Sequence, residues 1–237
     1  MRRPIALLSA LVCCAAATAA SADPPAPSGV PSLYTRPGEL LGHTLRFRGM
    51  LPADQAGRTL QVQRQEADGS WTQTATAVVA ADGSFLARWR TDEIGSFTVR
   101  ALVAGVQAQT ADASTPTTSV TIYRPARATW FGPGFYGKHT ACGEVMSHAL
   151  LGVAHRKLPC GTPVAVFFGG KSITVPVIDR GPFGNGARYD LTSGVAQLLG
   201  MTQTSTIGVM PQRGAQMAPP AQPVSPYAGT GGAPPTP

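Results

Sequence analysis

The sequence DGSFLARW, residues 82–89, decides the fold of the first half of the chain. An Asp-Gly pair followed by alternating apolar and polar residues is typical of a tight turn that leads into a β-strand. The pair Asp68-Gly69 is likewise followed by a serine and an aromatic residue. We therefore expect a β-hairpin at each of these two turns.

The same alternation continues on both sides of these turns. Apolar pairs separated by one residue occur at Leu45 and Phe47, Leu60 and Val62, Phe97 and Val99, and Val120 and Ile122. About seven short strands within about 90 residues indicate an immunoglobulin-like β-sandwich over residues 33–124. Its role stays open between a passive spacer and a module that binds the cell wall or an envelope protein partner.

The composition of the 237-residue chain fits two small domains with flexible ends. Gly and Pro number 27 and 22, and charged residues make up only 13%, which excludes a long coiled coil and a highly charged disordered protein. The formal net charge is +7, but no run of basic residues is interleaved with aromatic ones. We therefore expect no nucleic-acid partner.

The N-terminus has the pattern of a secretory signal peptide over residues 1–22. Arg2 and Arg3 precede an apolar run that ends in small residues before Asp23. The run is too short and too rich in alanine for a membrane span. We expect cleavage after Ala22 and a secreted or cell-envelope protein without stable membrane insertion.

Cleavage at that point leaves two cysteines, Cys142 and Cys160. In an oxidising compartment the two thiols are expected to form a disulfide; the alternative is a metal pair, which two cysteines alone do not complete. We expect no metal and no cofactor. Lipid attachment at Cys13 or Cys14 is disfavoured, because no small residue directly precedes Cys13.

The remaining segments differ in composition. Residues 23–32 form a Pro-rich leader and residues 211–237 a Pro- and Gly-rich tail, and we expect both to be disordered. Between the sandwich and the tail, residues 126–210 predict a compact β-barrel with one or two short helices. Strands are expected at residues 163–168, 172–178 and 206–210. One helix should begin after Thr192, present Val195, Ala196, Leu198 and Leu199 on one apolar face, and end at Gly200.

Carboxylates are scarce in this second domain, which makes each of them informative. Asp190 precedes the helix and is expected to be structural. Asp179 follows a strand and could orient a ligand or hold a loop, whereas Glu144, beside Cys142, favours a functional role. His155 alone would be an ordinary structural histidine. His139 and His148 are expected at the surface.

Five ordered motifs closely resemble the rare lipoprotein A (RlpA) family over about 85 residues. The motifs are Ala128-Thr129-Trp130-Phe131-Gly132, Thr140-Ala141-Cys142-Gly143-Glu144, residues 154–162 (AHRKLPCGT), Asp179-Arg180-Gly181-Pro182-Phe183, and Asp190-Leu191-Thr192. The resemblance implies a double-psi β-barrel like that of expansins, acting on bacterial cell walls as an endolytic peptidoglycan transglycosylase.

The resemblance also implies roles for single residues. Glu144 and His155 match the family's activity-associated residues, and Asp179 matches the Asp of its Asp-Arg-Gly-Pro motif. Two positions depart from the pattern: Ser147 stands where an Asp is common, and Gly152 where a Thr is common.

These matches predict a catalytic set of Glu144 as proton donor, Asp179 as its support and His155 as a hydrogen-bonding group. Sugar rings could stack on aromatic residues, and an arginine could bind the same substrate; the candidates are Trp130, Phe131, Phe135, Tyr136 and Arg180. A core position for Trp130 is the alternative. The rival functions are a non-catalytic, expansin-like module that loosens wall polymers and a purely structural envelope protein.

Overall fold

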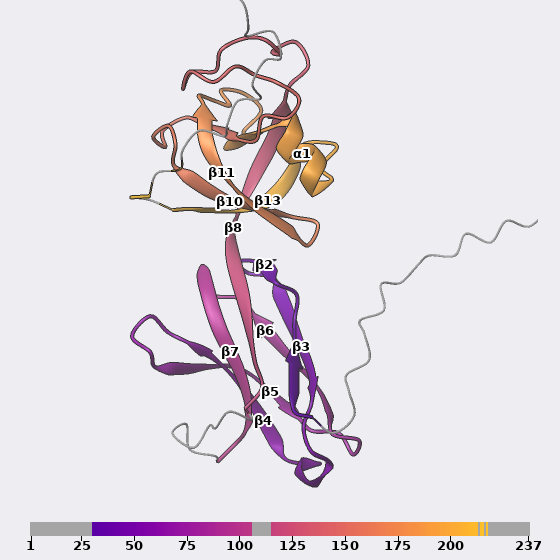
Figure 1. Cartoon of the computed structure of the whole chain (residues 1–237). Coiled ribbons are helices and arrows are strands. Elements are labelled where there is room, and N and C mark those ends of the chain that lie inside the picture. The colour runs from indigo at the N-terminus through magenta and orange to yellow at the C-terminus, as the bar shows by residue number, and fades with distance from the viewer. Residues whose placement is uncertain (1–29, 106–114, 213, 216, 218–237) are drawn as a thin grey trace, which may run out of the picture.

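The computed structural model describes residues 30–105, 115–212, 214–215 and 217, and these form a mainly β protein (Figure 1). The predicted signal peptide, residues 23–29 of the predicted leader and most of the tail lie outside the described residues. No helix among the described residues is long and apolar enough to cross a membrane.

The first half is a sandwich of two sheets (Figure 1). One sheet has the order β1 (Ser32–Tyr34), β3 (Thr44–Met50), β6 (Ser84–Arg90). The other has the order β2 (Gly38–Leu40), β8 (Thr117–Phe131), β7 (Gly95–Val103), β4 (Thr59–Gln65), β5 (Trp71–Val78). A single 3-10 turn, η1 (Ala53–Gln55), follows β3.

The predicted alternation is confirmed, because both sheets turn their apolar residues into one shared core. Leu45 and Phe47 of β3 are fully buried, and they face fully buried Leu60 and Val62 of β4 within the same cluster. Burial of each such side chain contributes about 1.5–3 kcal/mol to folding. The immunoglobulin-like assignment of this sandwich stays a prediction.

The two Asp-Gly turns behave differently. Asp68-Gly69 joins β4 to β5, which pair antiparallel, so the predicted hairpin is confirmed. Asp82-Gly83 is also a tight turn, with φ of 84° at Gly83, but the predicted hairpin is wrong. β6 pairs with β3 instead of β5. Leu51, the residue after β3, donates its N–H to the Gly83 carbonyl at 2.9 Å, so the end of β3 lies beside the turn. The turn therefore carries the chain from one sheet to the other.

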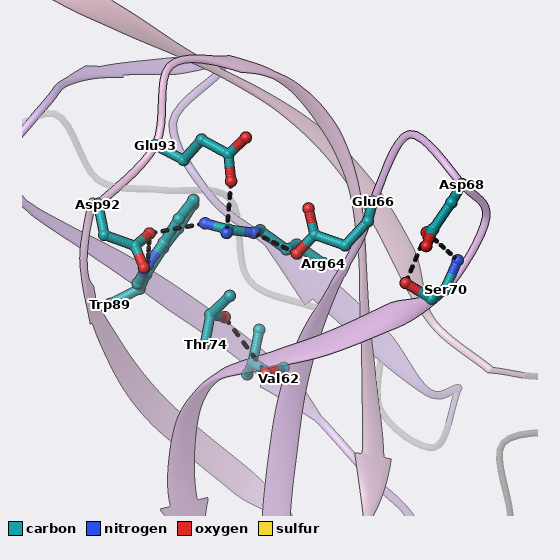
Figure 2. A network of polar contacts seen from close by, with 9 residues as sticks. All are labelled: Val62, Arg64, Glu66, Asp68, Ser70, Thr74, Trp89, Asp92 and Glu93. Atoms are coloured by element: carbon teal, nitrogen blue, oxygen red, sulfur yellow. Dashed lines mark hydrogen bonds and ion pairs between the residues drawn. The ribbon is translucent and has the colours of Figure 1, made fainter.

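Arg64 closes one end of the sandwich (Figure 2). Its side chain is 7% exposed and donates to Glu66, Asp92 and Glu93 at 2.9, 2.6 and 2.7 Å. The guanidinium also lies over the rings of Trp89 and Phe97. Burial opposes its charge, but the hydrogen bonds to the carboxylates outweigh burial and raise the pKa of Arg64. The network ties β4 to the segment that links β6 and β7.

The second half is a closed barrel, as predicted. Its strands follow the order β12 (Tyr189–Thr192), β9 (Val153–His155), β11 (Lys171–Asp179), β10 (Pro163–Phe168), β13 (Ser205–Pro211), β8. A further pairing of β12 with β8 closes the ring. The helix α1 (Ser193–Leu199) begins where Thr192 accepts from the Val195 N–H and ends at Gly200 in the left-handed region. Only Leu198 departs from the predicted apolar face, since it is 51% exposed.

Strand β8 belongs to both halves (Figure 1). Residues Thr117–Ile122 pair with β7, and the stretch from Arg124 onward pairs with β13. At the junction the Tyr123 ring stacks on Phe167 with centroids 4.9 Å apart. A side chain at Gly38 would collide with this pair, because its Cβ would lie 2.8 Å from Tyr123. The predicted division after residue 124 therefore falls within a strand and beside a packed contact, and it stays a prediction.

The isolated segment 33–124 is expected to fold by itself, because the core cluster of the sandwich draws all its members from this segment. It should lose some stability relative to the full chain, since Tyr123 loses its contact with Phe167. Urea denaturation followed by circular dichroism should give one cooperative transition. A disordered spectrum for this fragment would reject the domain division.

Candidate functional site

Four residues form a row across adjacent strands of the barrel. In the strand register, Asp179 of β11 lies beside Ala154 of β9, Ala154 beside Asp190 of β12, and Asp190 beside Thr129 of β8. Neighbours in register point to the same face of a sheet. The two carboxylates are thus separated by one strand, or about 10 Å between backbones. Ala154, which lies between them in the register, is buried.

Asp190 lies at the wall of a pocket beside this row. The pocket has a volume of about 340 Å³ and is lined by Thr129, Trp130, Pro182, Gly184, Asn185, Asp190 and Thr204. Trp130 is 37% exposed, so the alternative of a core position is wrong. Trp130 and Asp190 both line this pocket, and an exposed aromatic side chain can stack on the apolar face of a sugar ring.

The carboxyl group of Asp190 has an altered acidity. Burial raises the pKa of Asp190, and the negative charge of Asp179 raises it further. The hydroxyl of Thr129, which donates to Asp190 Oδ1 at 2.7 Å, opposes this rise in pKa. Asp190 therefore keeps its proton to a higher pH than an ordinary aspartic acid.

Sequence reasoning missed this residue as a functional candidate. It expected a structural role for Asp190, two residues before Thr192, the residue that caps α1. Two signals could have revealed Asp190. It stands in one of the five matching motifs, and its hydrogen-bond partner Thr129 stands in another.

Asp179 holds the loop that follows Lys138. The Oδ1 atom of Asp179 accepts hydrogen bonds from the N–H of Ala141 at 2.9 Å and from the N–H of the next residue, Arg180, at 2.8 Å. The loop-holding role, one of the two predicted alternatives, is therefore present. Because Asp179 also borders the row, the same side chain links the loop to the charge of the site.

Glu144 lies within that loop and is 9% exposed. Its Oε2 accepts the hydroxyl of Thr140 at 2.8 Å, and its carbonyl accepts the Thr140 N–H at 2.8 Å. Thr140 directly precedes Ala141, the residue bound by Asp179. Glu144 is thus connected to Asp179 through two neighbouring residues, and it does not line the pocket that contains Asp190.

His155 lies at the end of β9, paired with Tyr189. Its Nδ1 accepts the N–H groups of Lys157 and Leu158 at 3.1 and 2.9 Å, which assigns the ring proton of the neutral form to Nε2. Arg180 donates to the carbonyls of His155 and Leu158. This predicted substrate-binding arginine therefore holds the segment around His155 in place.

The predicted aromatic residues divide into two groups. Phe131 packs edge-on against Phe135 with centroids 5.9 Å apart, and Phe135 itself is 51% exposed. The Tyr136 hydroxyl donates to Ser193 at 3.1 Å, and its ring contacts His148. Tyr136 therefore ties the loop to α1 and Phe131 packs against Phe135, whereas Trp130 and Phe135 are the exposed aromatic residues.

Gly152, one of the departures from the family pattern, has a structural explanation. A Cβ at this position would lie 2.5 Å from the side chain of Ile178, which is fully buried. A threonine therefore requires a smaller or displaced partner at 178. Among the residues that the structure describes, no group of three or more His, Cys, Asp or Glu side chains could hold a metal ion.

The predicted disulfide between Cys142 and Cys160 is confirmed, with Cα atoms 5.8 Å apart. It joins the Glu144 loop to the His155 segment. Arg180, bound to that segment, also donates to Cys160 Sγ at 3.2 Å. The bond therefore holds together the two segments that surround Asp179.

Replacing both cysteines by serine should lower the free energy of unfolding of the barrel by about 3 kcal/mol. The disulfide links two residues that are 18 positions apart in the sequence, and this loop restricts the unfolded chain. Urea denaturation of the variant and of the oxidised wild type measures this difference. Two alkylatable thiols in the native wild-type protein would contradict the assignment.

The barrel matches proteins of known kind. The family model described as lytic transglycolase matches residues 125–211. A probable endolytic peptidoglycan transglycosylase RlpA of Synechocystis is 46% identical over 76 residues, 31% of this chain and 24% of its own. The endolytic peptidoglycan transglycosylases RlpA of Campylobacter jejuni and Vibrio cholerae are 40% and 38% identical, over 35% of this chain and 30% and 32% of their own.

The chain thus spans about a quarter to a third of the length of these relatives. The matched stretch begins within β8 and ends at the last barrel strand, so it coincides with the closed barrel. Residues 125–211 are a double-psi β-barrel domain of the RlpA family.

Proposed function

We propose that this protein is exported to the cell envelope, where its barrel cleaves peptidoglycan glycan strands as an endolytic lytic transglycosylase. The observation that carries the proposal is the raised pKa of the Asp190 carboxyl group, which lines a pocket together with Trp130. The names of the relatives supply the substrate class.

The reaction needs one group that gives and takes back a proton. The Asp190 carboxyl protonates the glycosidic oxygen as the bond from that oxygen to the anomeric carbon breaks. The C6 hydroxyl of the same sugar then bonds to the anomeric carbon, and its proton returns to the Asp190 carboxylate. The product carries a 1,6-anhydro ring, and no second carboxylate is needed to activate water, unlike in ordinary hydrolysis.

Asp179 supports this step through its negative charge, which raises the pKa of Asp190 and so favours the protonated form of the donor. Glu144 and His155, the other predicted catalytic residues, act in this proposal as positioning residues for the loop and the strand end.

Replacing Asp179 by Asn should shift the pH dependence of cleavage. The general acid must be protonated, so activity falls as pH rises through the pKa of Asp190. Removing the charge of Asp179 removes one cause of the raised pKa, so the fall should begin at lower pH. Initial rates across a pH series measure the shift. If the rate of the variant falls at the same pH as that of wild type, the charge of Asp179 does not affect the pKa of the proton donor, and the proposed link between the two carboxylates is contradicted.

The rival function is an expansin-like module that binds wall polymers in the same pocket without cleaving them. The exposed Trp130 would serve it equally well. Incubating the protein with purified sacculi and analysing the released material by mass spectrometry separates the two functions. Only the enzyme releases anhydro-muropeptides.

A further inference from the structure

The outer face of the first sandwich sheet carries four exposed arginines. Along β3 and β6, buried apolar residues alternate with outward-facing ones, and the arginines among the latter are Arg46, Arg48, Arg88 and Arg90. We call these four residues the arginine face. Every residue of β1, β3 and β6 is neutral or basic.

This arrangement does not stabilise the sandwich. Arg46 lies directly opposite Arg88 in the register of β3 and β6, and like charges at such positions are destabilising. Solubility does not require the arginines, because the other sheet exposes uncharged side chains at equivalent positions. These include Ser96 and Thr98 on β7 and Ser119 on β8. The exposed positive charge of Arg46, Arg88 and Arg90 therefore suits an anionic ligand.

A groove runs beside two of these arginines. It has a volume of about 1050 Å³, and its lining includes Arg46 and Arg48 together with Tyr34, Val78 and Leu86. The last three are 48%, 64% and 39% exposed. Guanidinium groups beside an apolar groove suit an organic anion that also has apolar parts.

We propose that the arginine face binds the carboxylates of peptidoglycan, most of which are carried by its stem peptides. The proposal rests on the proposed function, which supplies peptidoglycan as the polymer in contact with the chain. The planar guanidinium forks of arginine match carboxylates in a bidentate manner. Exposed ion pairs are individually weak, so the face needs a polymer that presents many carboxylates together.

The junction between the two halves gives this binding a consequence for cleavage. β8 runs unbroken from the sandwich into the barrel (Figure 1). At this junction the ring of Tyr123 packs on that of Phe167. A wall polymer held at the arginine face is therefore kept within a fixed reach of the barrel pocket. Such linkage raises the effective concentration of glycan at the pocket without a new contact there.

The test compares two variants that each lose three positive charges. One carries Arg46→Gln, Arg88→Gln and Arg90→Gln. The matched control carries Arg58→Gln, Arg124→Gln and Lys171→Gln, three exposed positions outside the arginine face. Binding is measured by co-sedimentation in the cold at low ionic strength. The sacculi are first freed of phosphate polymers with hydrofluoric acid, and one portion then has its carboxylates converted to neutral methylamides.

The arginine-face variant is expected to bind untreated, phosphate-free sacculi at least tenfold more weakly than wild type, and the control within about twofold of it. The binding of wild type to the methylamide sacculi should likewise be at least tenfold weaker than its binding to the sacculi that keep their carboxylates. Equal binding by the two variants, or equal binding to the two sacculus preparations, would overturn the inference. So would loss of wild-type binding after the hydrofluoric acid treatment, which would identify a phosphate polymer as the ligand.

Failure of this inference can be told apart from failure of the proposed function. Carboxylate-dependent binding without anhydro products would leave the arginine face standing and remove the transglycosylase activity. Anhydro products together with carboxylate-independent binding would leave the transglycosylase activity standing and remove the arginine face as the binding site. Release from short soluble glycan fragments, which do not reach the arginine face, should be the same for both variants and for wild type.

Discussion

Asp190→Asn is expected to lower the release of anhydro-muropeptides at least 100-fold while binding of glycan persists. Asparagine keeps the shape and can still accept from Thr129, but it has no proton to transfer. General acid assistance contributes about 100- to 10,000-fold to a rate, which sets the size of the loss. Rates are measured by chromatography of the products released from sacculi.

The matched control for this variant is Asp54→Asn, which removes an exposed carboxylate from the η1 turn of the sandwich. It should leave the rate unchanged. A loss of less than tenfold for Asp190→Asn, with Asp54→Asn unchanged, would show that Asp190 is not the proton donor.

Glu144 gives the second large effect, and here two substitutions must be compared. Glu144→Ala leaves the buried hydroxyl of Thr140 without its acceptor, at a cost of about 1–3 kcal/mol, and loosens the loop that Asp179 holds through Ala141. Cleavage should fall more than tenfold. Glu144→Gln keeps an acceptor oxygen for Thr140 and should stay within tenfold of wild type.

The resemblance of the motifs implies a different outcome at this residue. If Glu144 itself donates the proton, glutamine and alanine should be equally damaging, each with a loss of at least 100-fold, and Asp190→Asn should be mild. The pair of variants at 144, assayed together with Asp190→Asn on one preparation of sacculi, decides between the two donors.

The sequence predicted the elements of the fold well where the signal was local. The alternation of apolar and polar residues identified the strands around Phe47 and Val62, and both residues are buried. Thr192 and Gly200 marked the ends of α1. The pairing of the strands is a non-local property, and that is where local signals failed. The turn at Gly83 has the residues of a hairpin, yet β6 pairs with β3 because the end of β3 reaches the turn.

The candidate site shows the same division. The motifs identified Asp179 and the loop with Glu144, and the cysteine pair was predicted from the expected compartment. The sequence could not show that Asp190 and Asp179 lie on either side of Ala154. These three residues come from three different strands, β12, β11 and β9, which only the closed barrel brings together. The raised pKa of Asp190 depends on this neighbourhood and on burial, and neither is written in its local sequence.

The most direct test of the account is mass analysis of the material that the wild-type protein releases from intact sacculi, with Asp190→Asn alongside. The account predicts soluble muropeptides that end in a 1,6-anhydro ring, formed by wild type and missing from the variant. Release of fragments with ordinary reducing ends would show that water attacks the sugar, and release of nothing by wild type would show a binding module; either result would contradict the account.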